Sequence, residues 1–254
     1  MPNQLAISSI NVVASAADNT TAAKDRPVTP NELETLGMTD DFLAASGFEG
    51  NINQTALLPE RDAVVIAVGL GNEEITTATG RSSAAALWHA SKHLDSLTSL
   101  LPLAIASELG AEIALQAVVE GMLLASYSYD ELKGSPENAP NLQQITLVVP
   151  DGVDSTTVLQ KAESVANGIA LSRDLVNRPG GSLSATQLAD EAMAVADQTG
   201  LEIEVWDRER LVDERCGGII GVNAGSLEEP RPVSYTHLRA HETDSYLVCR
   251  LLLE

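Results

Sequence analysis

Short apolar runs alternate along the chain with longer segments of helical periodicity. The runs of strand length are residues 6–14, 63–68 and 144–149, together with the alternating residues 201–205 and the run GIIGV at 218–222. The run AVVIAV at 63–68 is apolar throughout, which is typical of a strand covered on both faces of its sheet. We therefore predict a strand at each of these places and expect 63–68 to lie centrally in a sheet.

Apolar spacings of three and four predict helices between these strands. One helix begins at Ser83 and a second covers 111–126, within an apolar region at 94–125 that reads as buried helix. A long helix ends before Pro179, and one face of it is predicted to carry Val158, Ala162, Val165, Ile169 and Val176. The alternation of strand and helix predicts an α/β fold with a mostly parallel sheet.

Three local signals refine the second half of the chain. Ser184 and Gln187 form a capping box that opens a helix, and Gly200 ends that helix. Asp207 is suited to cap a short helix that follows the strand at 201–205.

Composition and charge limit the possible partners and compartment. The chain has 36 acidic and 15 basic side chains, for a formal charge of -21, so we expect neither nucleic acid nor an anionic membrane surface as a partner. Charged residues interrupt the apolar region at 94–125, which argues against a membrane span. No secretory signal opens the sequence, and Cys216 and Cys249 lie far apart, so we expect a cytoplasmic protein.

Three groups of residues suggest chemistry at first sight. The Gly69 to Gly71 turn follows a strand and could let backbone amides approach a phosphate, but Glu73 and Glu74 follow it and favour a plain tight turn. His89 and His93 have a metal-ligand spacing, yet helical periodicity places both on the solvated face. His237 and His241 repeat that spacing without the internal glutamate of zinc helices. We predict no metal, cofactor or catalytic residue among them.

Four segments carry a family resemblance. ESVANGIALSRDLVNRPGGSLSAT at 163–186 resembles the segment that joins the two domains of leucyl (cytosol) aminopeptidases, where a motif like ARDLVNTPPN ends a helix. AVVIAVGLGNEE resembles the family's strand and VGLG turn, and LQAVVEGMLLASYSYDELKG resembles its AEGxxLxxYxFxxYK helix. GLEIEVWDRERLVDERCGGIIGVNAGSLEEPR resembles the entry into its catalytic domain. The resemblance covers most of residues 60–232.

The resemblance implies a macro-domain-like N-terminal α/β domain and a C-terminal α/β exopeptidase domain. Members of the family release N-terminal residues from peptides, often as hexamers, and use two manganese or zinc ions. Their metal ligands lie in motifs resembling GKGxTFDSGG and NTDAEGR, which do not occur in this chain, and no lysine follows Lys161. The resemblance therefore assigns no catalytic or metal-binding residue here, and we expect this stretch to be inactive and to bind no metal.

The expected division is an N-terminal domain at 1–152, a linking helix at 153–182 and the start of a truncated catalytic domain at 183–233. Residues 234–254 differ abruptly in composition and resemble translated sequencing-adaptor read-through, so a non-native tail is predicted there. A genuine divergent tail that forms one strand is the alternative. Two other functions stay open: a module that binds a nucleotide or ADP-ribose at the Gly69 to Gly71 turn, and a domain that serves assembly only.

Overall fold

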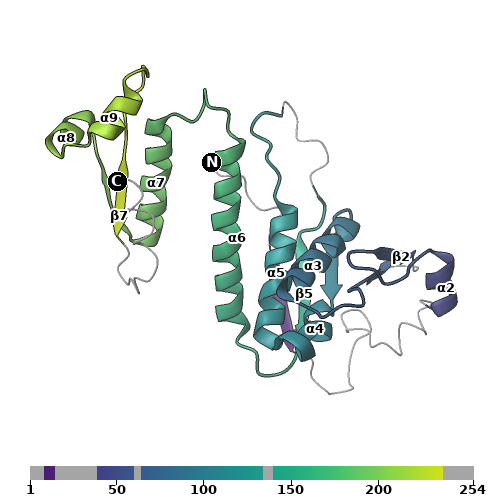
Figure 1. The fold of residues 1–254 in the computed structure, drawn as a ribbon. Coiled ribbons are helices and arrows are strands. Elements are labelled where there is room, and N and C mark those ends of the chain that lie inside the picture. The colour runs from purple at the N-terminus through teal and green to yellow at the C-terminus, as the bar shows by residue number, and fades with distance from the viewer. Residues whose placement is uncertain (1–8, 15–38, 60–63, 134–139, 237–254) are drawn as a thin grey trace. The chain divides into compact units, whose positions relative to one another are not determined.

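The computed structural model describes residues 9–14, 39–59, 64–133 and 140–236 (Figure 1). The chain divides into two compact units, the first ending at Asp174 and the second beginning at Leu175. The predicted loop at 18–30 and the pair His237 and His241 lie outside the described residues.

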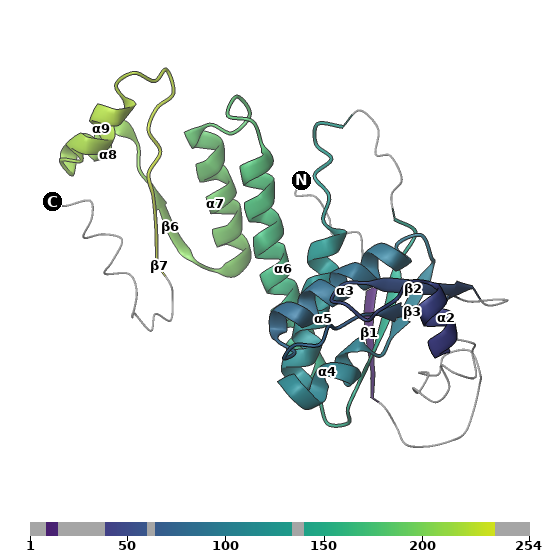
Figure 2. The ribbon, with the colours of Figure 1, turned by 45° about the vertical axis from the view of Figure 1, so that its right-hand side comes forward.

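The first unit contains a three-stranded parallel sheet in the order β1-β5-β4. β5 (Gln144–Val149) lies in the centre, between β1 (Ser9–Ala14) and β4 (Ser96–Ser99). Figure 2 shows β1 in purple within this unit. The strand predicted at 144–149 is thus found with the expected bounds, and its parallel neighbours confirm the predicted α/β class. β4 was not predicted.

The apolar run at 63–68 has a different place from the one predicted. It forms β3 (Val64–Val68), which pairs antiparallel with β2 (Thr55–Pro59) in a separate two-stranded sheet. All five β3 residues are half-buried, so the prediction of a central, doubly covered strand was wrong. An apolar run predicts a strand that is shielded from water. It does not predict which other strand pairs with it. Here the partner is the strand that precedes it in sequence.

Helices pack on the sheet of the first unit. α3 (Thr77–Ser91) begins six residues before the predicted Ser83, because Thr76 and Thr79 form a reciprocal capping box at its start. α5 (Ala111–Ser126) has the predicted bounds. The region at 94–125 is not one helix: β4, α4 (Leu101–Leu109) and α5 succeed one another, and Gly110 separates the two helices with φ +84°.

The contact between α3 and α5 is made by small residues. A Cβ added to Gly121 would overlap the backbone of Arg81, and one added to Gly80 would lie 3.3 Å from the Cβ of Ala117. Beside this contact, the guanidinium of Arg81 donates to the Glu120 carboxylate at 3.1 Å. Glu120 is 5% exposed and also accepts from Gln116 at 2.6 Å, so its buried charge is paired on two sides.

One hydrophobic core fills the first unit. Its buried residues come from α3, α4, α5, the sheet and the first half of α6 (Ser155–Asn177). Fully buried members include Ile105, Leu115, Met122, Ile145 and Leu147. Aliphatic side chains therefore dominate this core, and Trp88 is its aromatic member.

The buried face of α6 differs from the predicted face. Asp154 precedes this helix and accepts from the Thr157 backbone N–H, and hydrogen bonds from Thr157 hold the pKa of Asp154 below its usual value. The buried residues recur every four positions: Val158, Ala162, Ala166, Ala170 and Asp174. The predicted members Val165, Ile169 and Val176 are exposed. Alanines allow closer packing than β-branched residues, so the face of smaller residues is the one against the core.

The second unit confirms the local helix signals. α7 (Ala185–Thr199) begins at the Ser184 and Gln187 capping box, and Gly200 ends it in the left-handed conformation with φ +74°. β6 (Glu202–Val205) follows, and Asp207 caps α8 (Arg208–Asp213) by accepting from the Arg210 N–H at 2.9 Å.

Two features of the second unit differ from prediction. The run at 218–222 lies in the helix α9 (Gly217–Asn223), not in a strand, so that prediction was wrong. β-Branched residues raise strand propensity, but here they lie in a short helix that begins after a turn, in which Arg215 has φ +57° and Cys216 is the N-cap residue. β7 (Val233–Thr236) pairs antiparallel with β6. This strand pair, in the described part of the unit, therefore differs from the mostly parallel sheet that was predicted. Residues 234–236 of the predicted tail take part in this pairing.

We expect Gly121→Ala to destabilise the first unit by about 1–3 kcal/mol, because the added methyl overlaps backbone that cannot move freely. Chemical denaturation monitored by circular dichroism measures this. Gly168→Ala is the matched control: it lies within α6, its Cβ would meet nothing within 4 Å, and helix propensity predicts a gain of about 0.5–1 kcal/mol. Equal effects of the two variants would contradict the role of close helix packing.

We also expect the second unit to be the first to yield to protease. Its described residues bury few apolar side chains, namely Ala189, Ala196 and Leu211, whereas the first unit has a continuous core. Thermolysin under native conditions should cut within 175–236 about tenfold faster than within 64–133. Mass spectrometry of a time course identifies the cuts, and digestion in denaturant gives the intrinsic rates. First cuts inside α3 or α5 would contradict this expectation.

Candidate functional site

The Gly69 to Gly71 turn is occupied by contacts within the chain. The Gly69 N–H donates to the Gln54 carbonyl at 2.8 Å, and the Gly71 N–H donates to the Gly50 carbonyl at 2.9 Å. The Gly69 carbonyl accepts from Asn53 and from the buried hydroxyl of Ser83. A Cβ on Gly69 would overlap the Asn51 carbonyl oxygen, which explains the glycine. These two amides hold a neighbouring loop, so they do not point freely at a phosphate, and the tight-turn interpretation fits the structure.

The first histidine pair lies on the solvated side, as helical periodicity predicts. His89 is exposed near the end of α3, and His93 is exposed just after that helix. His89 lies edge to face with Trp88, with ring centroids 5.1 Å apart. Within the described residues, no three His, Cys, Asp or Glu side chains are grouped so that they could hold a metal ion. The donor set of the described residues therefore does not fit a two-metal centre.

The segment SRDLVNRP covers the end of α6 and the turn after it. Asp174 is buried and accepts a hydrogen bond from the Tyr127 hydroxyl at 2.7 Å. The Arg173 guanidinium lies over the Tyr127 ring, 3.9 Å from its centroid, and donates to the Leu124 carbonyl at 3.2 Å. Tyr127 directly follows α5, so these contacts join the C-terminal ends of two helices in the first unit.

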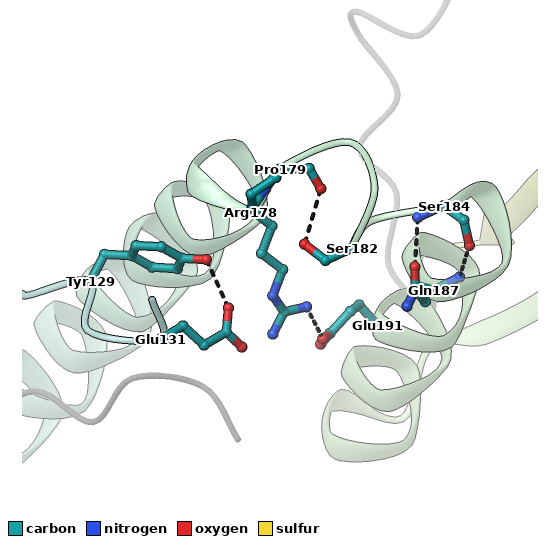
Figure 3. A network of polar contacts seen from close by, with 8 residues as sticks. All are labelled: Tyr129, Glu131, Arg178, Pro179, Ser182, Ser184, Gln187 and Glu191. Atoms are coloured by element: carbon teal, nitrogen blue, oxygen red, sulfur yellow. Dashed lines mark hydrogen bonds and ion pairs between the residues drawn. The ribbon is translucent and has the colours of Figure 1, made fainter. Parts of the chain in front are cut away.

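The turn after α6 is held by polar contacts within the second unit. The Arg178 guanidinium donates to the Glu191 carboxylate at 2.6 Å, and the Ser182 hydroxyl donates to the Pro179 carbonyl at 3.0 Å (Figure 3). Figure 3 also shows Ser184 and Gln187 exchanging hydrogen bonds at the start of α7. Arg178 is 14% exposed, so its pair with Glu191 is shielded from solvent better than a surface pair.

These polar contacts hold helices and turns in place. They do not bring together side chains in a catalytic arrangement. The sequence motifs include the segments that hold Tyr127, Arg173, Asp174 and Arg178. No partner could be predicted for these side chains from the sequence. Their partners lie 13 to 49 positions away in sequence, beyond the reach of helical or strand periodicity. Ser226 also has carboxylates nearby in sequence. Its hydroxyl accepts from the Glu228 N–H at 3.1 Å in a local turn.

The comparisons with known proteins agree on one family. Residues 21–136 match the N-terminal domain of the cytosol aminopeptidase family, and residues 170–249 match its catalytic domain. The second match continues beyond the predicted break at 233. The chain belongs to the cytosol aminopeptidase family, and it comprises the N-terminal domain and part of the catalytic domain.

Individual relatives give the same picture. The chain is 32% identical to the probable cytosol aminopeptidase of Mycobacterium sp. (strain JLS) over 207 residues, which is 79% of this chain and 38% of the relative. It is also 32% identical to that of Streptomyces coelicolor over 243 residues, which is 85% of this chain and 44% of the relative. The chain therefore spans about two fifths of the length of the curated relatives it matches.

Solved structures support the fold. The bottromycin maturation enzyme BotP is 28% identical, with a TM-score of 0.68 over 90% of this chain and 46% of that protein. A mutant of tomato leucine aminopeptidase has a TM-score of 0.73 over 95% of this chain and 54% of its own, at 19% identity, which supports the fold alone. In the described residues, no helix is both long and apolar enough to cross a membrane.

We expect ADP-ribose at millimolar concentration to leave the Tm of the chain unchanged, because the Gly69 and Gly71 amides already donate to carbonyls of the chain. Differential scanning fluorimetry measures this, and a macro domain that binds ADP-ribose serves as the positive control. A rise in Tm that saturates with ADP-ribose would contradict the expectation and favour the nucleotide-binding alternative.

Proposed function

We propose that this chain is the N-terminal part of a metal-dependent leucyl-type aminopeptidase, an enzyme that releases N-terminal amino acids from peptides. The observation that carries the proposal is the order of the two domain matches. The N-terminal domain match is followed by the catalytic domain match, and the SRDLVNRP helix end falls within the second match, just after it begins. Chance similarity of one helix or one turn would not reproduce this order.

In the complete enzyme, two manganese or zinc ions would bind the substrate amine and activate a water, which is two-metal hydrolysis. Their ligands would come from motifs resembling GKGxTFDSGG and NTDAEGR, which the 254 residues do not include. A structure of BotP, a similar protein, is described as a complex with Mn. The complete enzyme would act on peptides as a cytoplasmic homo-oligomer, a hexamer as in the family.

The residues of this chain would supply the N-terminal domain, the helix that leaves it and the entry of the catalytic domain. They would not bind the metal ions or touch the scissile bond. Lys161 is the last lysine in the sequence, so the family's catalytic and ligand lysines have no counterpart in its second unit. The acidic surface suits a protein that stays in solution and avoids nucleic acid. We therefore propose that the 254-residue chain alone is inactive.

The test is hydrolysis of leucine p-nitroanilide by the purified chain with added manganese, and separately with zinc. The expected rate equals that of the buffer blank, because the sequence has no lysine after Lys161 and neither of the motifs that would supply the two-metal site. A full-length cytosol aminopeptidase from Streptomyces coelicolor, assayed in parallel, is the positive control. Manganese-dependent turnover that co-elutes with the chain in size-exclusion chromatography would contradict inactivity, whereas the family assignment would stand.

A further inference from the structure

The last turns of α6 carry a charge where its sequence pattern calls for an alanine. The buried stripe of this helix reads Val158, Ala162, Ala166 and Ala170, and its next position is Asp174. Asp174 is 3% exposed, and it lies in the last turn of α6, where the helix dipole disfavours a negative charge. Burial and position both oppose a carboxylate here, so its presence needs a specific partner.

The partner comes from the end of α5. The Tyr127 hydroxyl donates to the Asp174 carboxylate at 2.7 Å, a short distance typical of a charge-assisted hydrogen bond. Tyr127 has extended backbone and is the residue at which α5 ends. The contact therefore ties the last turn of α6 to one defined point on the first unit.

Arg173 adds a second tie to the same point. Its guanidinium stacks on the Tyr127 ring and donates to the Leu124 carbonyl. Leu124 lies in the last turn of α5, where carbonyls have no partner within the helix, and that turn holds no basic residue of its own. Arg173 supplies both the missing donor and the positive charge that a helix C-terminus favours.

These contacts lie at the boundary of the two units. α6 continues as one helix from Ser155 to Asn177, and the boundary falls after Asp174. Beyond Ala170, the buried residue of α6 is Asp174 itself, while Val176 is 83% exposed. Apolar packing holds the first four turns of the helix, and it gives little support to its end.

We propose that Tyr127, Arg173 and Asp174 form a latch that holds the end of α6 on the end of α5 and keeps α6 helical across the boundary. The latch fixes the last turn of α6 to the end of α5 within the first unit. It accounts for Arg173 and Asp174 of the SRDLVNRP segment, and it does not depend on the proposed activity.

Hydrogen exchange followed by mass spectrometry tests the latch in the 254-residue chain. In Asp174→Asn and in Tyr127→Phe, amides at 170–177 should exchange about tenfold faster, because a hydrogen bond to a charged group is lost. Amides at 156–164 should keep their rates, since the alanine stripe holds them. If Asp174→Asn does not fold, Tyr127→Phe decides alone, because it removes one hydroxyl and leaves the ring under Arg173.

Two comparisons separate the latch from general loosening. Glu163→Gln makes the same chemical change as Asp174→Asn on the exposed face of α6 and should leave both segments unchanged. The double variant Tyr127→Phe with Asp174→Asn should exchange no faster at 170–177 than the faster single variant, because both lose the same contact. Unchanged rates at 170–177, equal acceleration of the two segments, or multiplied effects in the double variant would each overturn the latch.

Discussion

The close contact between α3 and α5 is the constraint on which the rest of the first unit depends. Gly80 and Gly121 lie where any side chain would meet the other helix, and the ion pair between the partly exposed Arg81 and the buried Glu120 joins the two helices beside this contact. Because α5 also contacts α4 and β5, its position sets the core beneath the sheet. The end of α5 then receives the end of α6 through Tyr127.

Much of this architecture could be predicted from local signals, and the failures have a common physical cause. Capping residues such as Ser184 and Asp207 act within three positions, so the sequence reveals them directly. The bounds of α5 and β5 follow from apolar periodicity. Pairing and packing depend on residues far away in sequence. The central position predicted for β3 was wrong, and the β-branched run in α9 was predicted as a strand. The predicted buried face of α6 was right at Val158 and Ala162 and wrong further along the helix.

The candidate site shows the same difference between local features, which could be predicted from the sequence, and distant contacts, which could not. Periodicity correctly placed His89 and His93 in solvent, and the Gly69 and Gly71 amides donate to carbonyls of the chain, which agrees with the plain turn predicted there. The side chains that join the elements, above all Asp174 with Tyr127, could not be found this way, because an aspartate in a helix gives no sign of a partner 47 positions earlier. The family resemblance drew attention to the SRDLVNRP segment, but it did not predict the hydrogen bond between Tyr127 and Asp174.

The chain belongs to the cytosol aminopeptidase family and comprises its N-terminal domain and part of its catalytic domain. The first unit has a complete core, whereas the described second unit buries few apolar residues.

The most direct test is the genomic nucleotide sequence beyond codon 233. The account predicts an open frame that departs from SYTHLRAHET and encodes motifs resembling GKGxTFDSGG and NTDAEGR. A genomic frame that encodes residues 234–254 as written and lacks both motifs would contradict it.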